Sequence, residues 1–212
     1  MTDSWNDARP QSAWFNFKQI PISSDWFQLY EIAANLFVFY EPRHYEQTLV
    51  NLIIGQDRAA LIDTGCGIGD LRTAVKAVTD KPIVVINTHT HPDHLGGNHQ
   101  FDEIAMFDHP LAHQVAESGD ILLHDPVWTH LEGGNLNDLV MSYRTLMEYY
   151  DDFDHLMSSH NEPWIGKQLL PASLAGAEQV ISGQATYQEI TDPWNRQLRH
   201  YAFDQFSILT PQ

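Results

Sequence analysis

The stretch that decides the fold reads Asn87-Thr88-His89-Thr90-His91-Pro92-Asp93-His94-Leu95-Gly96-Gly97-Asn98. It directly follows residues 83–86, an apolar run of the composition typical of a strand. Alternate side chains of an extended chain share one face, so His89 and His91 should point the same way. The proline that follows them fixes the backbone, and we expect Asp93 and His94 to turn toward a second position. The stretch therefore indicates a metal site with room for two cations.

The clustering of these imidazoles carries more weight than any one of them. The chain has 12 histidines, and a single histidine is most simply a surface or core residue. Imidazoles packed as closely as His89, His91 and His94 would repel one another once protonated, and a shared cation removes that repulsion. Gly96 and Gly97 supply the backbone freedom that a tight exit from such a loop requires.

The motif His89-x-His91-x-Asp93-His94 resembles the signature of the metallo-beta-lactamase fold superfamily, and the Gly-Gly-Asn that follows is similar to its hydrolase branches. The resemblance extends upstream to residues 63–65, Asp-Thr-Gly, which follow an apolar run as the family places them. It extends downstream to residues 159–163, Ser-His-Asn-Glu-Pro, which look like the segment of the family's late metal-binding histidine, His160 here.

The resemblance implies two metal positions. His89 and His91 would form the first metal position, and Asp93, His94 and His160 the second. It also implies an α/β fold, a metallo-beta-lactamase-like αββα sandwich, with the metals at one edge between two sheets.

The chain departs from the family pattern between His94 and His160. No segment there resembles the one that gives the first position its third histidine, or the one whose aspartate bridges the metals, so the chain looks as if it lacks an internal segment near residues 127–131. The second sheet should be reduced, which favours a homo-oligomer. We assign no bridging role to Gly119-Asp120. His124, Asp125 and His130 are either substitute ligands or residues of a surface loop.

Hydrophobic runs and helical periodicity predict the elements outside the motif. We expect strands at residues 36–40, 48–54, 59–63, 83–87 and 201–209, and a short strand-like piece at 127–128. We expect helices after Asp70, from 136 to 150 with a cap at Asn135 or Asn137, and from 170 to 181 before Gly183. The first helix, lying between strands 59–63 and 83–87, would make a strand-helix-strand unit.

Composition narrows the class of protein. At 212 residues the chain suits one domain, 1–212, and its net charge of -17 with 11 Lys and Arg argues against nucleic acid and anionic membrane partners. Residues 1–19 lack the apolar core of a signal peptide, and no run is long enough to span a membrane. One cysteine, Cys66, fits a reducing compartment, so we expect a cytoplasmic protein. Cys66 is a ligand, a nucleophile or a small residue filling a turn.

The expected function is hydrolysis of a carboxylic ester, thioester or lactone, a small-molecule substrate, by a metal-activated water that Asp93 orients. Zinc is the first choice, as one or two ions, and iron or manganese suits the same ligands. Two alternatives stay open. One is a noncatalytic member with an incomplete metal site that serves as a binding or interaction module, and the other is an iron-dependent persulfide dioxygenase.

Overall fold

The computed structural model describes residues 12–88, 91–106, 127–129, 135–160, 164–192 and 194–212. Two compact units make up the chain: residues 1–116 with 159–163, and residues 117–158 with 164–212. His89, Gly119, Asp120, His124, Asp125 and His130 lie outside the described residues. The single domain expected over residues 1–212 stays a prediction.

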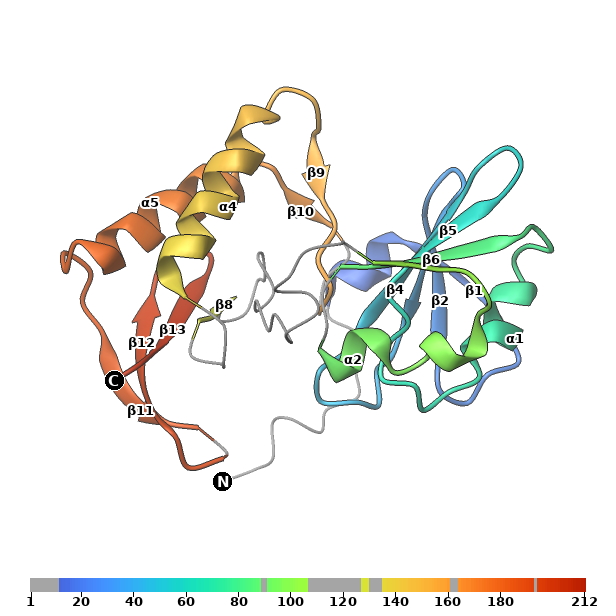
Figure 1. Ribbon diagram of the computed structural model, residues 1–212, viewed down its shortest axis with the longest axis horizontal. Helices are drawn as coiled ribbons and strands as arrows, with labels where there is room; N and C mark the ends of the chain where they lie inside the picture. Colours follow the sequence, from blue (N-terminus) through green and yellow to red (C-terminus); the bar gives the residue numbers. More distant parts are fainter. Residues whose placement is uncertain (1–11, 89–90, 107–126, 130–134, 161–163, 193) are drawn as a thin grey trace. The chain divides into compact units, whose positions relative to one another are not determined.

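The first unit is built on a seven-stranded mixed sheet (Figure 1). Its strands, in spatial order, are β1 (Lys18–Ile20), β2 (Gln28–Ala33), β3 (Leu36–Tyr40), β4 (Leu49–Ile54), β5 (Ala59–Ile62), β6 (Ile83–Asn87) and β7 (Ile104–Met106). Strands β1 to β5 pair antiparallel, whereas β5-β6 and β6-β7 pair parallel. The four strands predicted in this half are confirmed, two of them to the residue.

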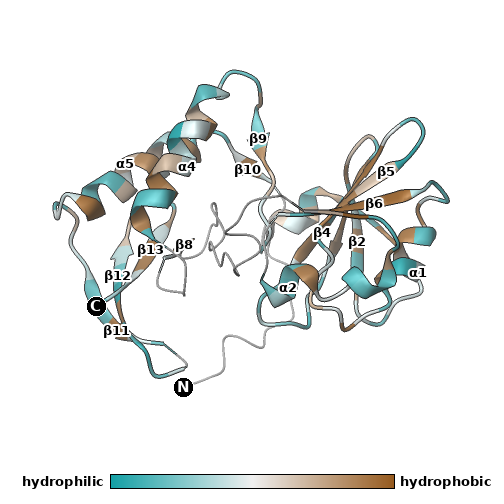
Figure 2. Cartoon of the chain, viewed as in Figure 1, coloured by the Kyte–Doolittle hydropathy of each residue, from teal (hydrophilic) through white to brown (hydrophobic). Residues whose placement is uncertain are grey.

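The strand-helix-strand unit is confirmed between β5 and β6. Helix α1 (Leu71–Lys76) begins at the predicted cap, where the Asp70 side chain accepts a hydrogen bond from the Thr73 backbone N–H at 2.9 Å. The face of the sheet that α1 covers carries one row of paired residues, Leu52, Leu61 and Val85. The apolar colouring of β5 and β6 in Figure 2 reflects this burial. The described residues of this unit also form the short helical turns η2 (Ser12–Asn16), α2 (Pro92–Leu95) and η3 (Asn98–Gln100).

The second unit has a sheet with four strands in its described part, and the expected reduction of this sheet relative to the family stays a prediction. Their order is β11 (Gln188–Thr191), β12 (Gln197–Ala202), β13 (Ser207–Pro211) and β8 (Val127–Trp128). Helices α4 (Leu136–Glu148) and α5 (Leu169–Ile181) pack their apolar residues against this sheet (Figure 1). A short pair of strands, β9 (His155–Leu156) and β10 (Ile165–Gly166), also belongs to this unit. Asn135 caps α4, as one of the two alternatives predicted.

One strand prediction is wrong. Residues 201–209 form the turn and flanks of a hairpin, β12 and β13, and not one strand. The Phe203 N–H donates to the Phe206 carbonyl at 2.9 Å across Asp204-Gln205, and the two phenyl rings stack on each other. The aromatic residues on both sides of the turn gave it the alternating pattern of a strand.

No described helix is both long and apolar enough to cross a membrane.

Glu41, the residue after β3, is a fully buried carboxylate that fixes the loop after β5. It accepts hydrogen bonds from the Trp26 indole N–H and from the Cys66 backbone N–H, the latter at 3.0 Å. Gly65 lies directly against it, because a Cβ at Gly65 would come within 2.5 Å of the Glu41 carboxylate. Burial raises the pKa of Glu41, and the hydrogen bonds from Trp26 and Cys66 oppose that rise.

Leu52 and Ile53, two isomeric side chains on β4, give a matched test of this core. Leu52 is completely buried and Ile53 is 45% exposed. Leu52→Ala should lower the free energy of unfolding by about 2–5 kcal/mol, and Ile53→Ala by less than about 1 kcal/mol. Urea denaturation of both variants measures the difference, and equal losses would contradict the assignment of the core face.

The raised pKa of Glu41 predicts a pH dependence of stability in the metal-free protein. Protonated Glu41 contributes fully below the ordinary carboxyl pKa of about 4.3, and this contribution is lost as the pH rises through the higher pKa of the folded state. Glu41→Gln removes that dependence. As the pH rises, wild type should therefore lose stability relative to the variant in urea denaturation with a chelator present. Parallel profiles would contradict burial as the dominant influence on Glu41.

Candidate metal centre

The centre lies where the parallel strands β5 and β6 end, the usual place for a site in such a sheet. Asp93 and His94 belong to α2, in the loop after β6, and the loop after β5 is bound to them through the backbone. The Thr64 N–H donates to the His94 carbonyl at 2.9 Å, and the Gly96 N–H donates to the Gly65 carbonyl at 3.0 Å. The two loops touch so closely that a Cβ at Gly96 would come within 2.4 Å of the Cys66 backbone.

His160 comes to the same place from a distant part of the sequence. The Leu49 N–H at the start of β4 donates to the Ser159 carbonyl at 2.8 Å, and Thr48 and His160 form an isolated antiparallel bridge. The His160 Nδ1 lies 2.7 Å from the Glu46 carbonyl oxygen. In the chain, His160 follows helix α4 and the short strand β9.

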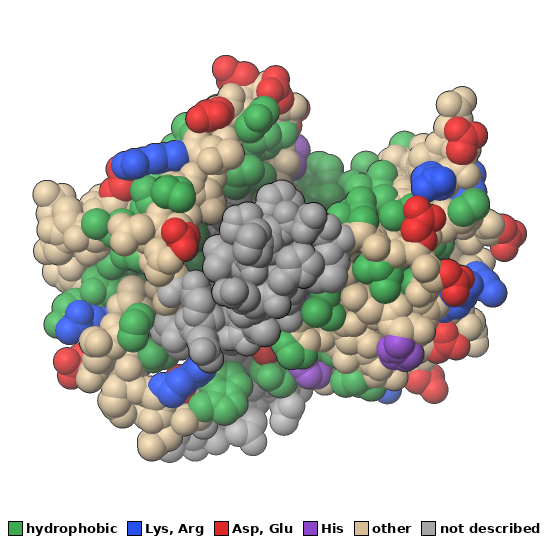
Figure 3. Space-filling model, viewed as in Figure 1, with side chains coloured by type: hydrophobic (Ala, Val, Ile, Leu, Met, Phe, Trp, Pro, Cys, Tyr) green, Lys and Arg blue, Asp and Glu red, His purple; other side chains and the backbone are tan. Residues whose placement is uncertain are grey.

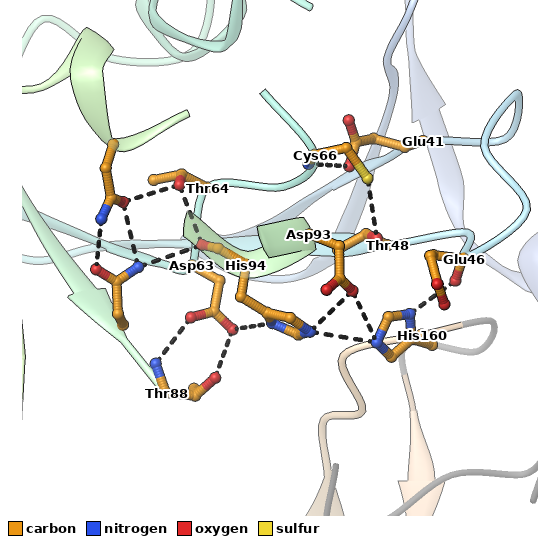
Figure 4. A network of polar contacts seen from close by, with 12 residues as sticks. Glu41, Glu46, Thr48, Asp63, Thr64, Cys66, Thr88, Asp93, His94 and His160 are labelled. Atoms are coloured by element: carbon orange, nitrogen blue, oxygen red, sulfur yellow. Dashed lines mark hydrogen bonds and ion pairs between the residues drawn. The ribbon is translucent and has the colours of Figure 1, made fainter. Parts of the chain in front are cut away.

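Three ligand atoms converge here: Asp93 Oδ2, His94 Nε2 and His160 Nε2 (Figure 4). The two nitrogens are 3.3 Å apart, and the oxygen lies 3.2 Å from His94 Nε2 and 3.5 Å from His160 Nε2. Both imidazoles are buried, whereas the Asp93 side chain is 17% exposed. The atoms thus form a nearly equilateral triangle that solvent reaches from the aspartate side.

The partners of the other ring nitrogens decide which protons the imidazoles carry. His94 Nδ1 faces the Asp63 carboxylate at 2.8 Å, and His160 Nδ1 faces a backbone carbonyl. An ionised carboxylate and a carbonyl only accept hydrogen bonds, so both Nδ1 atoms donate. In the neutral imidazoles each Nε2 is then an acceptor, and the triangle consists of three acceptors with no donor between them.

This triangle fits a metal ion. Tetrahedral zinc with nitrogen and oxygen ligands at roughly 2.0–2.1 Å has ligand atoms about 3.3–3.4 Å apart, close to the three observed separations. One shared proton would satisfy a single edge of the triangle, whereas a cation satisfies all three. Asp93, His94 and His160 are therefore suited to hold a metal with one position left for a further ligand.

Asp63 orients the His94 imidazole through the contact with its Nδ1. It is buried, and its carboxylate also accepts the Thr88 N–H at 2.8 Å and the Thr88 hydroxyl at 2.7 Å. Its φ of +61° is unusual for a residue other than glycine, a strain that surrounding contacts must hold in place. The Asp-Thr-Gly motif marked this position, but sequence alone did not predict its contact with His94.

The first metal position is less fully described. His91 is described, and its ring centroid lies 6.5 Å from that of His94, but it does not join the group of converging ligands found in the described residues. His89 lies outside them. Ligation by His89 and His91 therefore stays a prediction.

Two further side chains beside the centre were not predicted as a pair. His44 comes from the turn between β3 and β4, and its Nδ1 lies 3.3 Å from the sulfur of Cys66. The thiol also lies 3.5 Å from the Thr48 hydroxyl. Burial raises the pKa of the Cys66 thiol and lowers that of the His44 imidazole. His44 stands alone in the sequence, so no local pattern could have drawn attention to it.

Comparisons with known proteins agree with this geometry. The model of the metallo-beta-lactamase superfamily matches residues 45–162. The chain is 29% identical over 97 residues to the acyl-coenzyme A thioesterase MBLAC2 of Homo sapiens, and equally to that of Bos taurus. The human match covers 39% of this chain and 34% of the thioesterase, so the chain spans about a third of the length of these curated relatives.

Solved structures share the fold at low identity. A metallo-beta-lactamase from Erythrobacter litoralis superposes with a TM-score of 0.55 at 16% identity, covering 76% of this chain and 100% of the lactamase. The DIM-1 metallo-beta-lactamase superposes with a TM-score of 0.51 at 11% identity, covering 75% and 100%. The predicted metallo-beta-lactamase-like α/β fold is thus confirmed. Because the superfamily match spans more than half of the sequence and includes Asp93, His94 and His160, the chain belongs to the metallo-beta-lactamase superfamily.

Proposed function

We propose that the chain is a metal-dependent hydrolase of acyl compounds and that thioesters are its preferred class among esters, thioesters and lactones. The convergence of Asp93 Oδ2, His94 Nε2 and His160 Nε2 carries the proposal, because three acceptors within 3.5 Å call for a cation. The thioester preference draws on the relatives named acyl-coenzyme A thioesterase.

Asp93, His94 and His160 would hold the metal. Two imidazole nitrogens and one carboxylate oxygen suit zinc first, and iron or manganese also accepts this set. When bound, such an ion lowers the pKa of water and stabilises negative charge on a carbonyl oxygen. Donor types favour zinc without excluding the others.

The chain's own residues orient the ligands. Asp63 accepts the Nδ1–H of His94, and the Glu46 carbonyl accepts the Nδ1–H of His160, so that both Nε2 lone pairs face Asp93. These contacts fix each ring before a metal arrives. The conformational entropy of these side chains is therefore lost during folding and not on metal binding.

Asp93 serves as the proton acceptor in this proposal. It is the partly exposed member of the triangle, and a carboxylate there can accept a hydrogen bond from the attacking water and orient its lone pair toward the substrate carbonyl. The buried imidazoles have no such access to solvent.

The charge of the surface supports a small-molecule substrate. In the view of Figure 3, Lys and Arg side chains are scattered among Asp and Glu and form no continuous basic patch. With a net charge of -17, the chain offers a polyanion little attraction. A cytoplasmic location stays a prediction.

Asp63→Asn tests the support of His94. Asparagine tolerates a positive φ, so the loop can keep its shape while the charge that holds the Nδ1–H is lost. We expect metal affinity to fall about 10–100-fold, measured by competition with a chromogenic chelator. Asp102→Asn is the control, because that side chain is 89% exposed and pairs with Arg72. Equal affinities of Asp63→Asn and wild type would contradict the supporting role.

Asp93→Asn tests the reaction itself. On a panel of acyl-coenzyme A thioesters, aryl esters and lactones, the metal-loaded variant should lose at least about a hundredfold in kcat/KM, because it cannot take the proton of the attacking water. Asp154→Asn, at a side chain 88% exposed, should leave turnover unchanged. If wild type loaded with zinc, iron or manganese turns over no member of the panel, the noncatalytic alternative replaces the hydrolase.

A further inference from the structure

Cys66 and His44 bring two metal-binding atoms together beside the proposed centre. The sulfur and Nδ1 are 3.3 Å apart, and they come from different segments, the loop after β5 and the turn after β3. Thiolate and imidazole ligands of one tetrahedral zinc, at roughly 2.3 and 2.0–2.1 Å from the ion, lie about 3.5 Å apart. The pair is therefore already close to the spacing that a shared ion imposes.

Negative charge has accumulated around this pair and around the adjoining centre of Asp93, His94 and His160. Glu41 and Asp63 are buried, and Asp93 is largely so. In the part of the chain that the structure describes, neither Glu41 nor Asp63 forms an ion pair with Lys or Arg. Buried carboxylates require a compensating cation. One divalent ion offsets two of these three charges, whereas two divalent ions offset three carboxylates and one thiolate.

Asp93 connects the pair to the proposed centre. In Figure 4, Asp93 lies between the Cys66–Thr48 contact and the two imidazoles His94 and His160. Burial lowers the pKa of His44 and raises that of Cys66, and the negative charge of Asp93 acts on both groups, which places it within electrostatic reach of each. A cation held by Cys66 and His44 would therefore interact with the negative charge of Asp93 as well as with that of Glu41.

We propose that Cys66 Sγ and His44 Nδ1 are ligands of a second divalent cation, a thiophilic one such as zinc, beside the centre of Asp93, His94 and His160. The inference rests on the proposed metal centre and names further ligands for it. The ion replaces the thiol proton, which passes to solvent, and no electron is transferred. His44 Nδ1 gives up the long hydrogen bond of 3.3 Å that it accepts from the Glu46 N–H.

Cobalt(II) titration of the metal-free full chain tests the proposal, because a cobalt–thiolate bond produces a near-ultraviolet charge-transfer band that nitrogen and oxygen ligands do not. Cys66 is the chain's one cysteine, so any such band within a monomer belongs to it. Wild type should bind about two cobalt ions with the band. Cys66→Ser should lose the band and one ion, and His44→Ala should lose the second ion. His99→Ala, at an exposed imidazole, should resemble wild type.

The outcomes separate this proposal from the hydrolase. Two ions without the band would assign the second to other residues, such as His89 and His91, and would overturn the thiol ligand. One ion without the band would overturn it too and leave the centre of Asp93, His94 and His160 standing. Absence of cobalt binding would overturn both.

A second measurement uses wild type alone and does not depend on variants that fold. A maleimide should label Cys66 in the metal-free protein, and stoichiometric zinc should slow the labelling. Labelling that proceeds at the same rate with two bound zinc ions would overturn the proposal.

Discussion

The contact between the Asp63 carboxylate and His94 Nδ1, 2.8 Å long and buried, is the interaction on which the site depends. It fixes the proton on one side of the imidazole and leaves the other nitrogen for Asp93 and His160. Asp63 reaches that position only with a left-handed backbone. The loop after β5 tolerates this conformation because Thr64 and Gly65 are hydrogen-bonded to the segment that carries His94 and Gly96.

The neighbouring contacts show how little freedom the loops have. Glu41 accepts a hydrogen bond from the Cys66 backbone N–H, and Gly96 packs directly against the Cys66 backbone. The Glu41 carboxylate, the Cys66 thiol and the His44 imidazole thereby stay within electrostatic range of Asp93. The same packing that orders the ligands concentrates buried carboxylates, whose charge is partly offset by hydrogen bonds from Trp26, Cys66 and Thr88.

Local patterns carried much of the fold. The runs at residues 36–40 and 83–87 are β3 and β6, because apolar and β-branched residues with clear breaks on both sides specify buried strands. Strands β1, β2 and β11 were missed, since polar residues interrupt them and pairing with neighbours defines them. The hairpin of β12 and β13 was missed because Phe203 and Phe206 masked its turn.

The residues of the site divide in the same way, into those that a local motif marks and those that only the fold brings together. Asp93 and His94 stand in one motif, so sequence could point to both, and the motif around His160 was recognisable from the family resemblance. Glu41 and His44 carry no local signal, because their partners Trp26 and Cys66 are brought to them by sheet pairing. Proximity of this kind arises from register and burial, which a single sequence does not display.

The pairing of Leu49 with Ser159 sets the order in which the centre can be assembled on the ribosome. Asp93 and His94 are synthesised long before His160, and a nascent chain that ends before Ser159 holds two of the three ligand atoms. Stable metal capture must therefore wait until the sheet has formed and the later segment has emerged to pair with β4. A metal ion that needs all three ligands would bind only after the segment of His160 has joined the sheet, so its uptake would report on that pairing.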